Sequence, residues 1–129
     1  MANKSKQKGN AFEYDCQESL QAKMSDIILT NERGFQLQID LISEKHSATF
    51  ECKRHKKVLS WNECLKLYDK LCGVSVGYHH KYLLFKPNFQ PCLVFYYSKR
   101  LNGLCIRKFE EVFGVPFKKH TPIKRIKKQ

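Results

Sequence analysis

The stretch FECKRHKK, residues 50–57, sets Glu51 and Lys53 two positions apart and then continues into four basic or imidazole side chains. Apolar and polar residues alternate over residues 48–53, which predicts a β-strand with Glu51 and Lys53 on its polar face. The segment FQLQIDLI, residues 35–42, alternates in the same way, and the polar turn SEKHS joins the two segments. The sequence therefore predicts a β-hairpin with one packed face and one polar face.

The register of this hairpin decides which acidic side chains meet. The polar positions are even-numbered in the first strand and odd-numbered in the second, so they share a face only across a turn of even length. A turn centred between Lys45 and His46 places Asp40 opposite Glu51, where the Cβ atoms lie about 4.5–5.5 Å apart and like charges are destabilising. A divalent cation between the carboxylates would relieve this repulsion, because Mg²⁺ binds carboxylate oxygens, water and substrate phosphate. A solvated hairpin edge is the alternative interpretation.

The charge of the chain favours an anionic partner. Its 129 residues include 24 Lys and Arg against 12 Asp and Glu, a formal net charge of +12, in a chain that is 42% hydrophobic. Nucleic acid is therefore the leading candidate partner. No stretch approaches the ~18 uncharged apolar residues that span a bilayer, so no membrane partner is expected.

The cysteines bear on the cellular compartment. The N-terminus lacks the apolar segment of a secretory signal, and the six cysteines are therefore expected to be reduced thiols in a cytosol-like compartment. A zinc site formed by Cys64, Cys72 and His79 or His80 is a minor alternative.

The rest of the sequence predicts helices and buried strands around the hairpin. Asn10 is an N-cap candidate with Glu13 as its capping-box partner, and the turn at residues 31–34 ends this first helix. Its apolar stripe consists of Phe12, Cys16, Leu20, Met24 and Ile27. The capping-box pair in SWNE begins a second helix, KYLLF and CLVFYY predict buried strands, and LCIRKFEEVFG predicts a short strand and a helix that ends at Gly114.

These elements predict a single compact α/β domain with a central mixed β-sheet flanked by helices. We expect the domain to span residues 1–117, with a mobile basic arm at residues 1–9 and a basic C-terminal tail at residues 118–129.

Three segments, KGNAFE, QIDLIS and FECK, occur in this order on the predicted helix, strand and strand. In this combination the first half of the chain resembles the PD-(D/E)xK nuclease superfamily, and within it the archaeal-type Holliday junction resolvases with their phage and viral relatives. The resemblance implies a restriction-endonuclease-like fold. It also implies that Asp40 and Glu51 bind a catalytic Mg²⁺, or Mn²⁺ as a substitute, with the Cys52 carbonyl and Glu13 as further ligands. Lys53 would assist the attacking water.

The chain departs from the family pattern at Ile39, where the superfamily has proline. Basic residues flank the predicted site, and those expected to bind DNA phosphates lie in the N-terminal segment, directly after the second hairpin strand and at the start of the tail. They are Lys8, Arg54, His55, Lys56, Lys57, Lys118 and Lys119. For the loop after the strand the alternative is a solvated turn, and for the tail it is a solubilising end or a localisation signal.

The function expected from the resemblance is metal-dependent, structure-selective cleavage of DNA, with a four-way junction as the substrate. A homodimer would match the two-fold symmetry of such a junction, with CLVFYY and FEEVFGVPF as interface candidates or as parts of the domain's own core. The expected compartment is the cytoplasm, in association with the nucleoid, or the host cytoplasm or nucleus for a viral protein. Two alternatives stay open: a non-catalytic DNA- or RNA-binding protein of the same fold, and a nuclease of the superfamily with other DNA substrates.

Overall fold

β3 (Ala48–His55) and β4 (His80–Pro87) form the parallel pair inside a six-stranded mixed sheet, in a computed structural model that describes residues 4–30 and 39–120. All other neighbouring strands are antiparallel, and the strand order follows the chain from β1 to β6. The remaining elements are α1 (Lys4–Gln21), β1 (Ile28–Leu29), β2 (Leu41–Ser43), α2 (Trp61–Val74), β5 (Leu93–Ser98), β6 (Gly103–Lys108) and α3 (Phe109–Phe113). The predicted α/β domain with a mixed sheet is confirmed.

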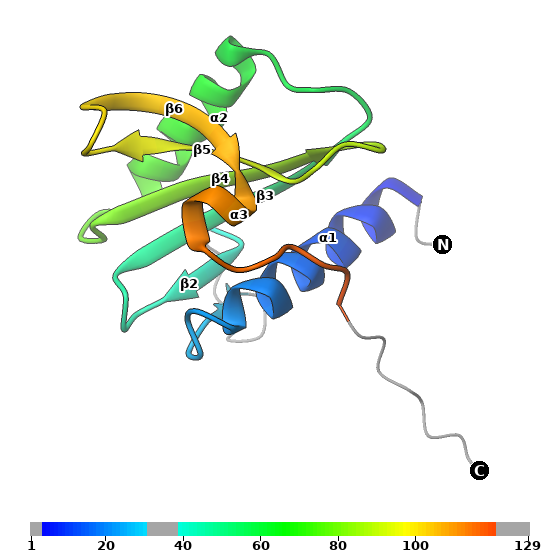
Figure 1. The fold of residues 1–129 in the computed structure, drawn as a ribbon, viewed down its shortest axis with the longest axis horizontal. Coiled ribbons are helices and arrows are strands. Elements are labelled where there is room, and N and C mark those ends of the chain that lie inside the picture. Colours follow the sequence, from blue (N-terminus) through cyan, green and yellow to red (C-terminus); the bar gives the residue numbers. More distant parts are fainter. Residues whose placement is uncertain (1–3, 31–38, 121–129) are drawn as a thin grey trace.

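Helices cover both faces of the sheet (Figure 1). Phe12 of α1 and Phe109 of α3 pack in one cluster with Phe50 of β3, on the first face. Parallel neighbours require a crossover connection, and α2 supplies it on the opposite face, where Tyr68 packs against Phe95 of β5 with ring centroids 5.3 Å apart. Because β3 is an inner strand with helices on both faces, it is not a solvated hairpin edge.

The hairpin register is the one predicted from the sequence. Leu41 of β2 pairs with Phe50 of β3, so the turn is centred between Lys45 and His46. β2 begins later than expected, and the first four residues of the predicted strand lie outside the described residues.

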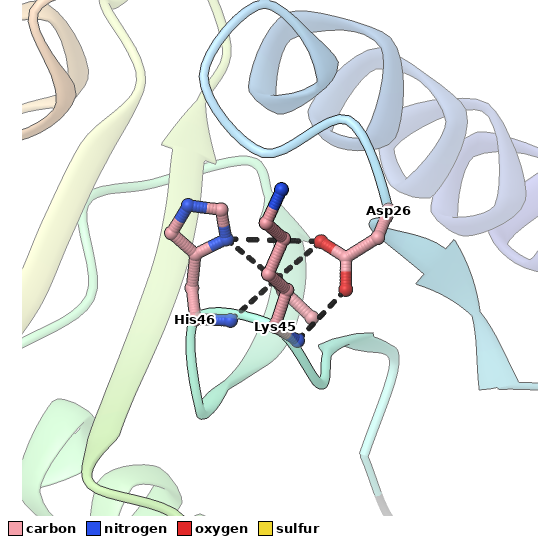
Figure 2. Close-up of polar contacts among 4 residues, drawn as sticks. Asp26, Lys45 and His46 are labelled. Atoms are coloured by element: carbon pink, nitrogen blue, oxygen red, sulfur yellow. Dashed lines mark hydrogen bonds and ion pairs between the residues drawn. The ribbon is translucent and has the colours of Figure 1, made fainter.

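Asp26, in the segment between α1 and β1, holds this turn (Figure 2). Its carboxylate accepts hydrogen bonds from the Ser43 hydroxyl at 2.7 Å and from the backbone N–H of Lys45 at 2.9 Å, and it lies 3.7 Å from Nδ1 of His46. Burial acts to raise the pKa of Asp26, but the hydrogen bonds from Ser43 and Lys45 lower it below its ordinary value. This contact fixes the start of β3 and thereby the register that positions the candidate site.

α1 is longer at its start and shorter at its end than predicted. It begins at Lys4, so Asn10 lies inside the helix and does not cap it, and the predicted capping box with Glu13 is wrong. Residues 4–9 of the predicted arm are helical, because the polar segment before Asn10 contains only Gly9 as a weak helix former. The predicted apolar stripe is buried throughout, but its last two residues lie in the turns that follow the helix.

The predicted second half of the fold agrees closely with the structure. The Ser60 hydroxyl accepts the backbone N–H of Glu63, and the Glu63 carboxylate accepts the backbone N–H of Ser60, so α2 has the predicted capping box. α3 ends at Gly114 in the left-handed conformation, with φ 72°. Most aromatics of the two interface candidates, such as Phe95 and Phe113, belong to the domain's own core.

The segment after α3 runs along α1 (Figure 1). The Ser19 hydroxyl donates to the carbonyl of Lys118 and accepts its backbone N–H, both at 3.0 Å. Asp15 accepts the backbone N–H of His120 at 2.8 Å and lies 2.6 Å from its Nδ1. The first three residues of the predicted tail are therefore docked on the domain, and residues 121–129 lie outside the described residues.

All six cysteines are free thiols, as predicted. The alternative zinc set of Cys64, Cys72 and His79 or His80 is not brought together in the described part of the chain. In that same part, no helix is long and apolar enough to cross a membrane.

Candidate active site

Asp40 lies at the point where β2 stops covering β3. The paired ladder ends at Leu41 and Phe50, and beyond it the backbone N–H of Asp40 donates to the Phe50 carbonyl at 2.9 Å. The Asp40 carboxylate then accepts the backbone N–H of Cys52 at 2.7 Å. The Asp40 carboxylate thus bonds to the backbone of β3 just beyond the described ladder, and this bond holds it beside β3.

The alternation of side chains is interrupted at this position. Leu41 packs in the cluster under α1, whereas Ile39 packs with Ile42 and with Leu71 of α2 on the opposite face. In a regular strand Ile39 and Leu41 would share a face, so the prediction of one continuous alternating strand is wrong here. An irregularity of the β-bulge type re-aims one side chain, and such features are frequent beside active sites. Asp40 is the residue that it re-aims.

Glu51 and Asp40 line a common pocket of ≈ 240 Å³. The other lining residues are Leu67, Lys70 and Leu71 of α2. The two carboxylates therefore face one space, although Asp40 reaches it from the end of the ladder and not from a regular position opposite Glu51. The polar face of β3 is closed farther along by the hydrogen bond between the hydroxyls of Thr49 and Ser75, at 2.8 Å.

Glu13 adds a third carboxyl group from α1. It shares a hydrogen bond with Asp40, and burial, followed by repulsion from Asp40 and this hydrogen bond, raises the pKa of Glu13 to about 7. Asp40 is partly buried, and this burial raises its pKa, although the N–H of Cys52 and the charge of Lys53 act in the opposite direction. Asp40 is thus the member of the cluster that links α1 to β3.

The pKa of Glu51 is raised to about 7 as well. Burial is the main cause, and repulsion by Asp40 and Glu13 adds to it, whereas Lys53 and Lys70 favour the ionised form. The pKa values of Glu13, Asp40 and Glu51 are all raised, mainly by burial, and two of these groups, Asp40 and Glu51, line the pocket. Such perturbed groups in a pocket mark a functional-site candidate, and a cation is the ligand that their charge favours.

Two lysines, Lys53 and Lys70, act on the carboxylates of the pocket, and only Lys53 was predicted from the sequence. Lys53 is exposed, lies two residues beyond Glu51 on β3, and acts electrostatically on both Asp40 and Glu51. Lys70 lines the pocket from α2, and it was not predicted from the sequence because no local spacing relates it to the hairpin. The signal that could have found it is its position one residue before Leu71, on a helix that must cross over the polar face of β3.

The backbone N–H of Cys52 donates to Asp40, and the metal-ligand role of the Cys52 carbonyl stays a prediction. Its thiol points to the other face, where it is buried in the cluster under α1, and burial raises the pKa of this thiol to about 12. The thiol is therefore a core group and not a nucleophile.

The basic residues expected to bind DNA are only partly gathered at one place. Arg54 and His55 belong to β3 itself, and the Arg54 guanidinium donates to the Lys86 carbonyl at 2.8 Å. Lys56 and Lys57 follow in an exposed connection. Lys8 lies within α1, where only its backbone is described.

Lys86 on β4 is a further basic residue in this region, and the sequence did not predict it. Burial lowers its pKa, and the nearby charges of Arg54 and Lys119 lower it further, with Asp15 acting in the opposite direction. Lys119 of the docked C-terminal segment is thus brought to the far end of β3, where it joins Arg54 and Lys86. Lys118 is exposed beside it. We call Arg54, Lys56, Lys57, Lys86 and Lys119 the basic end of the sheet.

The donor chemistry of the pocket suits a hard divalent cation. Within residues 4–30 and 39–120, no three His, Cys, Asp or Glu side chains are already arranged to enclose a metal ion. Mg²⁺, however, is commonly bound by one or two protein carboxylates together with water and substrate phosphate. The pair Asp40 and Glu51 fits that requirement.

No family model, curated protein or solved structure matches the chain. Its interpretation therefore depends on the chemistry of the pocket and on the sequence resemblance described above.

Proposed function

We propose that the protein is a metal-dependent, structure-selective DNA endonuclease of the PD-(D/E)xK type, with a four-way DNA junction as its substrate. One observation carries the proposal: Asp40 and Glu51 line a single pocket, and Lys53 and Lys70 act electrostatically on Glu51 there. Carboxylates paired with lysines, beside a basic surface, match the needs of phosphodiester hydrolysis.

Asp40 and Glu51 would hold Mg²⁺ or Mn²⁺, with Glu13 and the Cys52 carbonyl as further oxygen donors. When bound, the ion would lower the pKa of a water molecule and offset negative charge on the phosphate. The raised pKa values of Glu13 and Glu51 support this assignment, because burial, their main cause, disfavours the ionised carboxylates and a bound cation would offset both this cost and the added repulsion from Asp40.

The residues of the chain would divide the remaining work. Lys53 stands on an inner strand and would offset charge that develops on the scissile phosphate, at no cost in reorganisation. Arg54, Lys56 and Lys57 follow it directly and would hold the DNA backbone without reading base sequence. Selectivity for DNA shape is the expected result.

A homodimer is part of the proposal, because two cuts related by a two-fold axis resolve a symmetric junction. Sedimentation of the purified protein with and without a junction would test this part separately from catalysis.

The decisive experiment incubates a labelled four-way junction with the protein in Mg²⁺ and in EDTA. Paired cuts that require Mg²⁺ are expected for the native protein, with a loss of at least about 100-fold in rate for Asp40→Asn and Lys53→Ala. The matched controls are Asp69→Asn and Lys45→Ala, which change exposed residues outside the pocket. Normal cutting by Asp40→Asn would refute the proposed site.

The same assay separates the two alternative functions. A non-catalytic binding protein would retain the junction uncut, and Asp40→Asn would leave its binding unchanged. A nuclease with another substrate would cut flaps or nicked duplex faster than the junction, and the cuts would still depend on Asp40.

A further inference from the structure

The turn between β4 and β5 carries an aromatic residue that the fold does not use. Phe89 is 99% exposed, so its ring makes essentially no contribution to the core. Its φ of 59° lies in the left-handed region, which bulky side chains rarely adopt and which glycine or asparagine would occupy with less strain. Phe89 thus exposes an apolar ring to water and strains the backbone of the turn. Backbone strain of this kind often accompanies function.

The position of Phe89 is fixed by its neighbours. The backbone N–H of Asn88 donates to the Lys56 carbonyl at 3.3 Å, and that of Gln90 donates to the Pro87 carbonyl at 3.3 Å. Pro87 is buried at the end of β4, and Pro91 follows the turn with a restricted backbone. The turn that carries the ring is therefore fixed by backbone hydrogen bonds and flanking prolines.

The surroundings of this ring are cationic. Lys56, to which the turn is bonded, belongs to the basic end of the sheet, together with Arg54, Lys57, Lys86 and Lys119. In Figure 1 the β4–β5 turn and the connection from β3 to α2 lie at the same end of the molecule. Two acidic groups of this neighbourhood already have partners: Asp15 is bound to His120, and Glu63, which interacts with His55, accepts the backbone N–H of Ser60. A polyanion held on these cations would therefore meet an exposed aromatic ring.

We propose that Phe89 is a stacking wedge that enters the DNA at a weakened base step, such as a branch point, while the basic end of the sheet holds the backbone. This inference rests on the proposed function and adds the feature by which branched DNA would be distinguished from duplex. Apolar side chains inserted between base steps unstack them and kink the duplex. The insertion is least costly where stacking is already broken, so a wedge favours a branch over a continuous helix.

The sheet register gives the separation between wedge and pocket. His55 pairs with Pro87 across β3 and β4, and Glu51 precedes His55 by four residues. At about 3.3 Å per residue this is about 13 Å, and Phe89 lies two residues farther along the turn. A phosphate at the pocket would thus be separated from the wedged step by at least about four nucleotides, at 3.4 Å per step. The branch is expected at that offset from the cut.

The test measures base unstacking and not cleavage. A four-way junction with 2-aminopurine at the branch is titrated with the Asp40→Asn protein, and fluorescence and affinity are compared with those for a matched duplex at constant salt. The rise in fluorescence is expected to be lost in the double variants with Phe89→Ala and Phe89→Asn, and retained with Phe89→Trp. The preference for junction over duplex is expected to fall about tenfold with Phe89→Ala, with duplex affinity changed less than about twofold.

Phe89→Asn removes the ring without disturbing the turn, because asparagine tolerates the left-handed conformation. The melting temperature of this variant should not fall below that of the parent protein, so its loss of unstacking cannot be ascribed to unfolding. Val76→Ala, 84% exposed in the turn after α2, is the matched control for removing an exposed apolar side chain. A fluorescence rise that survives Phe89→Ala would overturn the wedge. An equal loss of duplex and junction binding, or a change of oligomeric state with DNA distortion intact, would overturn it as well.

The failures of the two proposals are distinguishable. If the native protein cuts junctions with Mg²⁺ and Phe89→Ala unstacks the branch as well as its parent does, the wedge proposal is refuted and the nuclease proposal is supported. If Asp40→Asn has no effect on cutting but Phe89→Ala abolishes unstacking, the proposed catalytic site is refuted and the wedge proposal is supported. If no DNA is bound, both fall.

Discussion

The carboxylate of Asp40 accepts the backbone N–H of Cys52 at 2.7 Å, where the ladder between β2 and β3 has ended. This bond ties an acidic side chain to the strand that carries Glu51 and Lys53. The same carboxyl group is hydrogen-bonded to Glu13, so Asp40 joins residues from α1 and β3. Its environment therefore links stability, pH dependence and cation binding.

Removing one charge from the pocket should stabilise the protein. Asp40→Asn retains an oxygen that can accept the N–H of Cys52 but loses the repulsion with Glu13 and Glu51. In EDTA we expect the melting temperature to rise by a few degrees, on the order of 1 kcal/mol, as is common where a functional site holds unfavourable charge. Calorimetry of Asp40→Asn and Glu51→Gln checks this, with the exposed Asp69→Asn as the unchanged control. A lower melting temperature for both would contradict the account of the cluster.

Addition of Mg²⁺ or Mn²⁺ should make the native protein more stable than Asp40→Asn, the reverse of the order expected in EDTA. A ligand that binds only the native state at 100 times its Kd adds about 2.7 kcal/mol of stability, and the native pocket should gain while Asp40→Asn gains little. Thermal scans in increasing metal concentration measure the effect. Equal stabilisation of the native protein and Asp40→Asn would place the ion elsewhere.

Without metal, stability should increase as the pH falls from 8 to about 5.5. Glu13 and Glu51 have pKa values of about 7 in the folded state and 4.5 ordinarily, so between these values the native state binds more protons than the unfolded chain. Stability falls with rising pH where the native state binds more protons, which gives the sign. Urea denaturation in EDTA at several pH values is the measurement, and the double variant Glu13→Gln with Glu51→Gln should show a flatter dependence. A native protein that is most stable at pH 8 would refute the predicted pH dependence.

The turn held by Asp26 should be sensitive to substitution. Asp26→Ala removes acceptors for the Ser43 hydroxyl and the Lys45 N–H, and we expect a loss of about 1–2 kcal/mol. The lowered pKa of Asp26 means that its stabilisation is present above its ordinary pKa and disappears as the pH falls below it. Urea denaturation at pH 7 measures the loss, with Asp69→Ala as the control. An unchanged midpoint would show that the register does not need this contact.

DNA binding should depend on salt through the basic end of the sheet. Replacing Lys57 or Lys86 by Ala should each reduce the slope of log K against log salt by about 1, if each contacts one phosphate. Lys23→Ala, at an exposed position just after α1, is the matched control. Titrations of labelled duplex between 50 and 200 mM salt, about the range in which such slopes are measured, provide the test. Slopes that match the control would remove these lysines from the interface.

The sequence predicted local features with clear periodicity or capping chemistry. The parity of polar residues and the even turn gave the correct pairing of Leu41 with Phe50. The reciprocal bonds of Ser60 and Glu63 define the start of α2 as expected, because both partners lie within four residues. These features depend on neighbours in the chain, and local sequence is therefore sufficient for them.

Features that depend on distant neighbours could not be predicted in this way. The interruption at Asp40 accompanies a bond between its side chain and the backbone N–H of Cys52, and alternation alone does not encode such a bond. Lys70 and Lys86 enter their clusters through the α2 crossover and the pairing of β4 with β3. The early start of α1 was missed because a polar segment gives no apolar period to follow.

The bonds from Ser19 to Lys118 and from Asp15 to His120 join residues about one hundred positions apart, the latter separated by 105. During synthesis on the ribosome, α1 emerges long before the segment that covers its side. Contacts between such distant positions are slow to form, since loop closure must precede them. The nascent chain should therefore complete its native packing only after His120 has been made, and ribosome-stalled chains that end before Phe117 should remain sensitive to protease at α1.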